Sequence, residues 1–154
     1  MLRDSASEMK KLDKPRSLKS ARTLTITYNL PISKTAKFWD ELKEGKVYAT
    51  KCANCGILHF PPVSDCGNCG SSTMEWSLLD DEGEVVTFTQ VFAKPASFSK
   101  EPDYIVAIAR LNDGVKVLAW LTGIKREDVK VGLKVKLVAK DFSDGRVSYE
   151  FIPA

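Results

Sequence analysis

Apolar and polar positions alternate through most of the second half of the chain, from Gly83 onward. A period of two is typical of β-strands, in which successive side chains point to opposite faces. The alternation predicts five strands, over residues Glu84–Val91, Tyr104–Leu111, Val115–Leu121, Leu133–Ala139 and Arg146–Phe151. This half of the chain is therefore expected to be all β.

The segments between these strands indicate how the strands connect. Asn112-Asp113-Gly114 and Ser143-Asp144-Gly145 carry residues that tolerate positive φ, which predicts two tight hairpins. Residues Thr122–Gly132 follow the third strand and are long enough for one helical turn. Five strands with a helical link after the third are typical of an OB fold, a small barrel that closes on itself. A different five-stranded barrel is the alternative.

The first half of the chain has shorter elements. Residues Thr23–Tyr28 alternate, which predicts a short edge strand or an extended arm before Pro31. Ser33 is a candidate N-cap for a short amphipathic helix over Lys34–Glu44, and Gly45 is a suitable residue to end it. Three further extended segments are predicted, at Lys46–Lys51, Leu58–Phe60 and Met74–Leu79.

The most specific motif is a cysteine pair that occurs twice. Cys52-Ala53-Asn54-Cys55-Gly56 and Cys66-Gly67-Asn68-Cys69-Gly70 follow one pattern, with ten residues between Cys55 and Cys66. Two residues between cysteines allow a tight turn to point both thiolates at one ion. The glycine lets the backbone fold beneath the sulfurs and donate N–H groups to them. Four thiolates complete a tetrahedron that zinc prefers, and such a closed site has no position for a catalytic water. We therefore expect one structural zinc ion.

Other interpretations of the cysteines stay open at this point. A redox dithiol, an iron centre in the same four-thiolate geometry, and four ordinary buried cysteines are the alternatives. A disulfide framework is disfavoured, because all the cysteines lie within 18 residues and no export signal precedes them. A reducing, cytoplasmic setting is expected.

Composition and charge narrow the class of protein. The chain has 154 residues, of which 44% are hydrophobic and 28% are charged, as in one ordinary globular domain. No apolar run approaches the roughly 20 residues of a membrane helix. The first 22 residues carry a net charge of +4, whereas residues 23–154 have 16 basic and 17 acidic side chains. We interpret the first segment as a solvated tail, and the near-neutral remainder argues against a nucleic-acid surface.

Groups for catalysis are scarce. The sequence has no dinucleotide-binding or phosphate-binding glycine motif, no nucleophile elbow and no histidine besides His59. A lone histidine between Leu58 and Phe60 is interpreted as a structural or surface residue. The acidic run Asp80-Asp81-Glu82 is interpreted as a solvated linker rather than a pair of catalytic carboxylates. An independent hydrolase or transferase would lack a visible nucleophile and base.

Two features remain as candidate binding sites. Phe38 and Trp39 are adjacent on the predicted helix and cannot both point in one direction, so at least one is expected to face another element or a partner. The loop Ala93–Asp103, with Phe98, joins the first two barrel strands, and OB folds commonly bind ligands through this loop. Core packing of the aromatics and a plain hairpin connection are the alternatives.

The combination of these motifs resembles one family closely. It resembles the acyl-CoA-associated proteins in which a rubredoxin-like zinc ribbon precedes an OB fold, found beside thiolases in archaea and bacteria. The resemblance covers residues from Ile32 to the C-terminus and rests on the helix with Phe38-Trp39, Gly45, the two cysteine motifs, Phe60-Pro61-Pro62, Trp76, Gly83, Tyr104, Leu111, Gly114 and Gly132.

The resemblance implies a non-catalytic subunit that binds thiolase-fold enzymes, including acetoacetyl-CoA thiolase and hydroxymethylglutaryl-CoA synthase, and helps to hold the CoA thioester. It implies a mainly β chain with a tail at residues 1–31, a helix and zinc ribbon at 32–79 and an OB fold at 80–154. The zinc ligands would be Cys52, Cys55, Cys66 and Cys69. Candidate residues for acyl-CoA or the partner are Lys34, Lys37, Phe38, Trp39, Phe98 and Tyr104.

The alternative function is a module that binds single-stranded nucleic acid. Phe88, Phe92, Phe98 or Tyr104 would then provide stacking surfaces for bases. Its difficulty is the lack of excess positive charge on residues 23–154.

Overall fold

The computed structural model describes residues 18, 21, 26–29, 31–99, 102–142 and 145–154. The chain divides into two units, residues 1–31 and 32–154. In the first unit, residues 26–29 belong to no helix or strand, so Ile26 to Tyr28 do not form an edge strand, and the alternative of an extended arm stays a prediction. Residues 23–25 and most of the predicted basic tail lie outside the described residues. The predicted boundary at residues 79 and 80 lies within the second unit and stays a prediction.

The only α-helix among the described residues, α1, covers Ala36–Lys43 and begins later than predicted. The Thr35 amide donates to the Ile32 carbonyl at 2.8 Å, which closes a turn over Ser33 and Lys34 before helical bonding starts. Ser33 is therefore not the N-cap, and the Thr35 side chain makes no capping hydrogen bond. The helix ends at Lys43, one residue before the predicted end, and Glu44 is its C-cap. Gly45 follows with a φ of 80°, in keeping with its predicted role as the stop, and the Lys46 amide donates to the Glu41 carbonyl.

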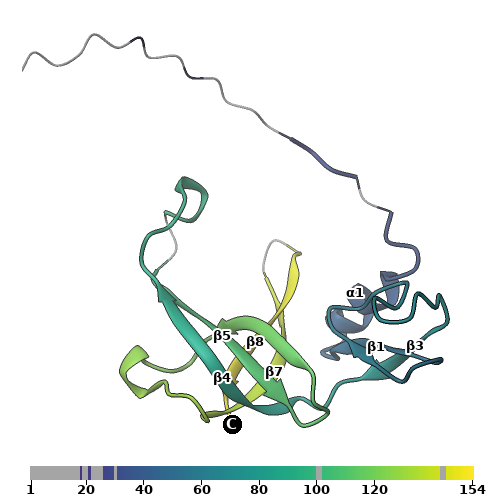
Figure 1. The fold of residues 1–154 in the computed structure, drawn as a ribbon. Helices are drawn as coiled ribbons and strands as arrows, with labels where there is room; N and C mark the ends of the chain where they lie inside the picture. The colour runs from purple at the N-terminus through teal and green to yellow at the C-terminus, as the bar shows by residue number, and fades with distance from the viewer. Residues whose placement is uncertain (1–17, 19–20, 22–25, 30, 100–101, 143–144) are drawn as a thin grey trace, which may run out of the picture. The chain divides into compact units, whose positions relative to one another are not determined.

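A small three-stranded sheet follows the helix. Strand β1 (Tyr48–Cys52) lies in the centre and pairs antiparallel with β2 (Leu58–His59) and β3 (Met74–Leu78). These strands agree with the predicted segments except that their ends differ by one or two residues. Figure 1 shows β1 and β3 beside the helix, joined to the barrel by the segment that follows β3.

Five strands form a closed barrel, as the alternation predicted. They are β4 (Glu82–Val91), β5 (Tyr104–Leu111), β6 (Lys116–Leu121), β7 (Lys134–Asp141) and β8 (Val147–Pro153). Their order is β4-β5-β6-β8-β7, closed by pairing of β4 with β7, with β6 and β8 parallel. A short 3₁₀ turn, Arg126–Asp128, lies between β6 and β7. This order confirms the OB fold over the alternative barrel.

The barrel interior contains both small and large apolar side chains. Ala107 and Ala109 on β5 are almost fully buried, as is Phe151 on β8. Small residues on one wall leave room for the large ring from another. Gly83 has a steric role, because a Cβ there would collide with the Arg110 carbonyl on the paired strand. The helix residues Phe38 and Leu42 belong to the same continuous core.

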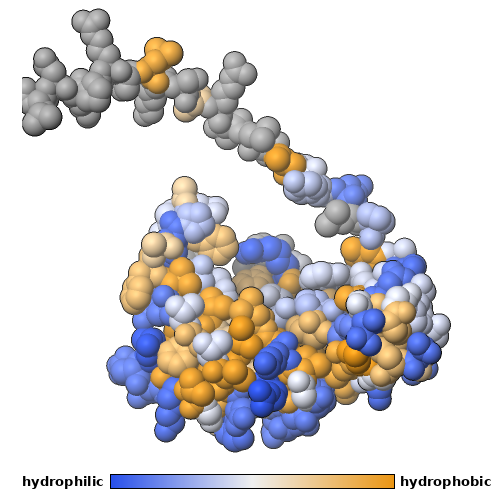
Figure 2. Space-filling model, viewed as in Figure 1, coloured by the Kyte–Doolittle hydropathy of each residue, from blue (hydrophilic) through white to orange (hydrophobic). Residues whose placement is uncertain are grey.

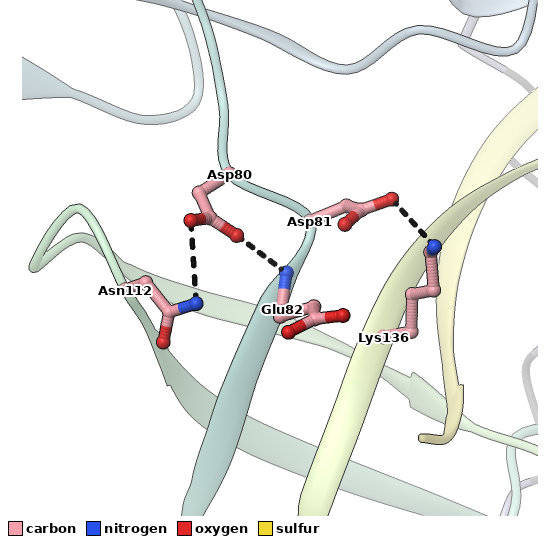
Figure 3. A network of polar contacts seen from close by, with 5 residues as sticks. All are labelled: Asp80, Asp81, Glu82, Asn112 and Lys136. Atoms are coloured by element: carbon pink, nitrogen blue, oxygen red, sulfur yellow. Dashed lines mark hydrogen bonds and ion pairs between the residues drawn. The ribbon is translucent and has the colours of Figure 1, made fainter.

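The acidic run forms a hydrogen-bonded junction between β3 and the barrel (Figure 3). The Asn112 amide donates to one Asp80 oxygen at 3.2 Å, and the Glu82 backbone N–H donates to the other at 3.0 Å. Asp81 pairs with Lys136 at 3.2 Å. The interpretation as a linker is consistent with these contacts, but the carboxylates are tied to the barrel rather than merely solvated.

None of the helices within the described residues is long and apolar enough to cross a bilayer. The cytoplasmic setting stays a prediction.

Candidate zinc centre and aromatic groove

The four cysteine sulfurs converge on one point. All four Sγ atoms lie within 4.8 Å of one another, and the pairs Cys52–Cys69 and Cys55–Cys66 are each 3.6 Å apart. A zinc ion with Zn–S bonds of about 2.3 Å requires sulfurs about 3.8 Å apart in a tetrahedron. The four thiolates therefore fit one zinc ion and leave no ligand position open.

The two knuckles have the same backbone geometry. The Gly56 amide donates to the Cys52 carbonyl and the Gly70 amide donates to the Cys66 carbonyl, both at 2.9 Å. Both glycines have positive φ, 75° and 72°, which costs little without a Cβ. Both glycines thus close the turn of their knuckle as predicted, but their N–H groups donate to the carbonyl of the first cysteine rather than to a sulfur.

Neighbouring side chains contact the sulfurs from outside the predicted ligand set. His59 Nε2 lies 3.3 Å from Cys66 Sγ, and Asn54 Nδ2 donates to Cys69 Sγ at 3.6 Å. Hydrogen bonds from the Asn54 side chain, the Ser71 backbone and the Cys52 thiol lower the pKa of the Cys69 thiol from 9.0 to about 6. The ribbon thus favours the thiolate form that a metal requires. The sequence indicated a structural histidine but not this contact.

A buried threonine ties the ribbon together. Thr50 on β1 is 3% exposed; its Oγ1 accepts from the Val63 amide at 2.9 Å and lies 3.2 Å from the Val63 carbonyl. Val63 lies in the segment between the knuckles, so this pair of bonds fixes that segment onto β1. No motif in the sequence marked Thr50.

Phe38 and Trp39 have different environments. Phe38 is 4% exposed, and its ring makes edge contacts with Phe60 of the ribbon at 6.0 Å and Tyr149 of the barrel at 6.3 Å. Trp39 contacts the Phe38 ring at 5.1 Å but is 41% exposed. Phe38 is therefore a core residue, whereas Trp39 meets the expectation that one of the pair lies at the surface.

The candidate lysines lie on the ribbon side. Lys37 Nζ is 4.8 Å from the centre of the Tyr48 ring and 5.8 Å from that of Trp76, a cation–π arrangement. Lys34 lies near Asp65 of the ribbon. Side-chain hydrogen bonds from Ser72 and Ser64 lower the pKa of Asp65, and the positive charge of Lys34 lowers it further by a smaller amount. The structure does not bring these two lysines together with Phe98 and Tyr104.

Phe98 and Tyr104 line a cavity of about 520 Å³ on the outside of the barrel. Tyr104 stacks on Trp120 with ring centres 4.4 Å apart and planes 19° apart, and Phe98 lies 6.3 Å from Tyr104. The far side of the cavity includes Phe142 and Tyr149. We call this cavity the aromatic groove. In Figure 1, the β4–β5 loop and the far end of the β7–β8 hairpin project from the same end of the barrel.

Most of the residues that line the groove were not among the predicted site residues. Trp120 was available as a signal, because it alternates with the buried Ala119 and Leu121 and so points outward. Tyr149 gave no comparable signal. The other stacking candidates lie outside the cavity: Phe92 is 65% exposed, and Arg126 covers the ring of Phe88 at 4.6 Å.

Comparisons with known proteins agree with the fold. Residues 39–75 match the model of the ChsH2 rubredoxin-like zinc ribbon domain, and residues 76–140 match that of the ChsH2 C-terminal OB-fold domain. A DUF35 domain-containing scaffold protein from Methanocaldococcus jannaschii is 30% identical over 132 residues, which cover 82% of this chain and 94% of that protein. The chain belongs to the DUF35 family.

Other relatives are named as subunits of enzymes. The benzoylsuccinyl-CoA thiolase subunit BbsA of Thauera aromatica is 32% identical over 106 residues, covering 66% of this chain and 72% of that subunit. Among solved structures, a chain of an Ltp2–ChsH2(DUF35) aldolase matches with a TM-score of 0.68 and 24% identity, over 79% of this chain and 94% of that chain. The latter likeness supports the fold.

The metal assignment follows from the family and the geometry together. The matched ribbon is a zinc ribbon, and the four sulfurs have the spacing that one zinc ion requires. This DUF35 protein therefore holds one structural zinc.

Replacement of one thiolate tests this assignment. The purified chain is expected to hold about one zinc ion, and Cys66→Ser is expected to lose it and to melt at a lower temperature. Elemental analysis and melting curves measure both, with Asn68→Ala, at an exposed position of the same knuckle, as the control. A wild-type chain that is free of metal yet fully folded would contradict the assignment.

The contacts around the sulfurs give a second prediction. His59→Phe and Asn54→Leu are expected to weaken zinc binding by about tenfold to hundredfold, because each removes an N–H beside a thiolate. His59→Gln retains an N–H donor and should lose less affinity. Competition with a chromogenic chelator measures the affinities, and equal affinity in all variants would show that these contacts do not matter to the metal.

Proposed function

We propose that the protein is a non-catalytic scaffold subunit of enzymes that act on CoA thioesters. The partners would be thiolase-fold enzymes, including acetoacetyl-CoA thiolase and hydroxymethylglutaryl-CoA synthase, and the subunit would help to hold the thioester between them. The names of the relatives support this role, since they include scaffold proteins and a CoA-thiolase subunit. The aldolase with the similar fold also pairs a DUF35 chain with a second protein.

The observation that carries the proposal is the exposure of Trp39 on a helix whose opposite face is immobilised. A helix of eight residues is not stable alone in water. Here the buried Phe38 and Leu42 attach it to the core, so Trp39 is held at a defined position with 41% of its surface open. Rigid exposed aromatic side chains of this kind are enriched at the centres of protein interfaces.

The described residues also lack an arrangement suited to acid–base catalysis. His59 contacts a zinc-ligating sulfur, and the carboxylates of the junction are engaged by Asn112 and Lys136. The isolated chain is therefore expected to show no thioester hydrolysis or condensation. A thioester assay on protein free of contaminating enzyme checks this, and turnover that persists through purification would contradict the non-catalytic role.

Two substitutions separate the partner surface from the core. Phe38→Ala is expected to cost about 3–5 kcal/mol of stability, because it removes a buried ring. Trp39→Ala is expected to leave the melting temperature nearly unchanged and to weaken the complex with the cognate thiolase at least about tenfold. Melting curves and a quantitative pull-down from co-expression with the thiolase and the synthase measure these effects.

The matched control is Ile57→Ala, because Ile57 is an apolar side chain that is 40% exposed, about as much as Trp39, and lies on the ribbon outside the helix. It should preserve both stability and the complex. If Trp39→Ala retains the complex, the helix is not part of the surface that binds the partner. If the wild-type chain binds neither enzyme, the proposed partners are wrong.

A further inference from the structure

Strand β3 forms one edge of the ribbon sheet, and one side of its backbone is unpaired. In the sheet order β2-β1-β3, it pairs with β1 alone. The Leu79 amide donates to the Val47 carbonyl, and the Ala53 amide donates to the Thr73 carbonyl, both at 3.0 Å. Hydrogen-bonded pairs alternate along an antiparallel ladder. Counting inward from these two bonds, every second residue of β3 turns its backbone groups away from β1.

The residues turned away are Met74, Trp76 and Leu78. Within the part of the chain that the structure describes, their backbone N–H and C=O groups form no hydrogen bond. Such a row of free donors and acceptors is a template for another strand, and native proteins usually protect it. We call these three residues the free edge.

The side chains of the free edge form an apolar row on one face of the sheet. Leu78 is 56% exposed, and Met74 and Trp76 are half-buried. Figure 2 shows hydrophobic residues at the surface in the region of β1 and β3 as well as over the barrel. The usual protections are missing: β3 contains no proline, its pairing with β1 has no bulge, and its one charged residue, Glu75, points to the other face.

The free edge is complementary to a second copy of itself. In an antiparallel pair about a two-fold axis at Trp76, this residue lies opposite its own copy, and Met74 lies opposite Leu78 of the second copy. Each of these three residue pairs exchanges two backbone hydrogen bonds, which gives six bonds and uses every free group of both edges. A shift of the register by two residues would leave some of them unpaired.

Charges on the other face of the sheet accept the same register. Glu75 falls opposite Ser77 of the second copy, so no carboxylate faces another directly across the pair. Lys51 on β1 is paired with Glu75 in the same chain and balances its charge. Like charges directly opposite each other would have opposed the pairing.

We infer that β3 pairs with β3 of a second copy of this chain. The product is a two-fold symmetric dimer with a continuous six-stranded sheet in the order β2-β1-β3-β3-β1-β2, in which each chain contributes the same surface. One strand from each chain is a small interface, so we expect a dissociation constant of about micromolar or weaker.

The dimer goes beyond the proposed function and is compatible with it. Lys37 lies 5.8 Å from the centre of the Trp76 ring, on the side of the helix that faces the ribbon. Trp39 lies two residues further on, about 200° around the helix axis. Strand pairing therefore leaves Trp39 exposed, and one scaffold particle would present two copies of the proposed partner surface.

Two measurements on the zinc-loaded full chain test the inference. In sedimentation from about 1 µM to 1 mM, the average mass is expected to rise from that of one chain towards twice that value. In hydrogen exchange followed by NMR, the amides of Met74, Trp76 and Leu78 are expected to become protected over the same range. The amides of Glu75 and Ser77 already bond to β1 and should be protected at every concentration.

A charge in the apolar row tests the interface itself. Leu78→Lys is expected to weaken the dimer at least about tenfold while it keeps the zinc and the melting temperature, because Leu78 is largely exposed in the single chain. The matched control is Val131→Lys, the same kind of change at an apolar residue that is 66% exposed outside the ribbon. It should dimerise like the wild type.

A second substitution tests the register. Addition of Met74→Glu to Leu78→Lys is expected to restore most of the lost affinity, because each new carboxylate lies opposite the lysine of the other chain. The two positions are about 13 Å apart along one strand, so recovery requires a contact between chains. Should Met74→Glu fail to fold, the alternating exchange pattern of the wild type still tests the pairing.

Several outcomes would overturn the inference. They are a wild-type chain that stays monomeric at about 1 mM, a dimer whose protected amides lie outside β3, and a dimer that Leu78→Lys leaves unchanged. Protection of the free edge that appears only when the thiolase is added would assign this edge to the enzyme instead of a second copy. Trp39→Ala is expected to keep the dimer, so loss of the enzyme complex and loss of the dimer are distinguishable.

Discussion

The mutual repulsion of four thiolates is the constraint on which the ribbon depends. Two like charges about 4 Å apart repel by about 4 kcal/mol at an effective dielectric constant of about 20, and the site contains six such pairs. Only a cation at their centre makes this geometry favourable. Strand β2 has two residues and the whole sheet has three strands, which is too little to fold without that ion.

The ribbon in turn determines where the helix lies. Phe60 follows β2 and contacts Phe38, which also contacts Tyr149 on the barrel. The Phe38 ring is therefore in contact with both the ribbon and the barrel, and it fixes the orientation of α1. The position of Trp39 at the surface follows from this packing rather than from any helix propensity, since the helix is short and has no side-chain cap.

Local patterns in the sequence were sufficient for the elements and for the metal ligands. Alternation located all five barrel strands, and the repeated spacing located Cys52, Cys55, Cys66 and Cys69, because both signals involve residues that are close in the chain. The aromatic groove was only partly predictable. The groove forms because Trp120 lies beside Tyr104 and because the Tyr149 ring contacts Phe38. Both contacts depend on strand register and on barrel closure. The helix start was misjudged for a different reason, because a local turn over Ser33 and Lys34 competes with the cap.

The parallel contact between β6 and β8 has a consequence for the dynamics of the barrel. It joins only two residue pairs, Trp120 with Glu150 and Leu121 with Phe151, whereas β5 and β6 pair over six. This seam has the fewest paired residues of the barrel, so local opening should cost least free energy there and its amides should exchange with solvent early. Trp120 and Glu150 are also lining residues of the groove. A molecule that contacts both would bridge the seam, and its binding free energy would add to the cost of opening the barrel there.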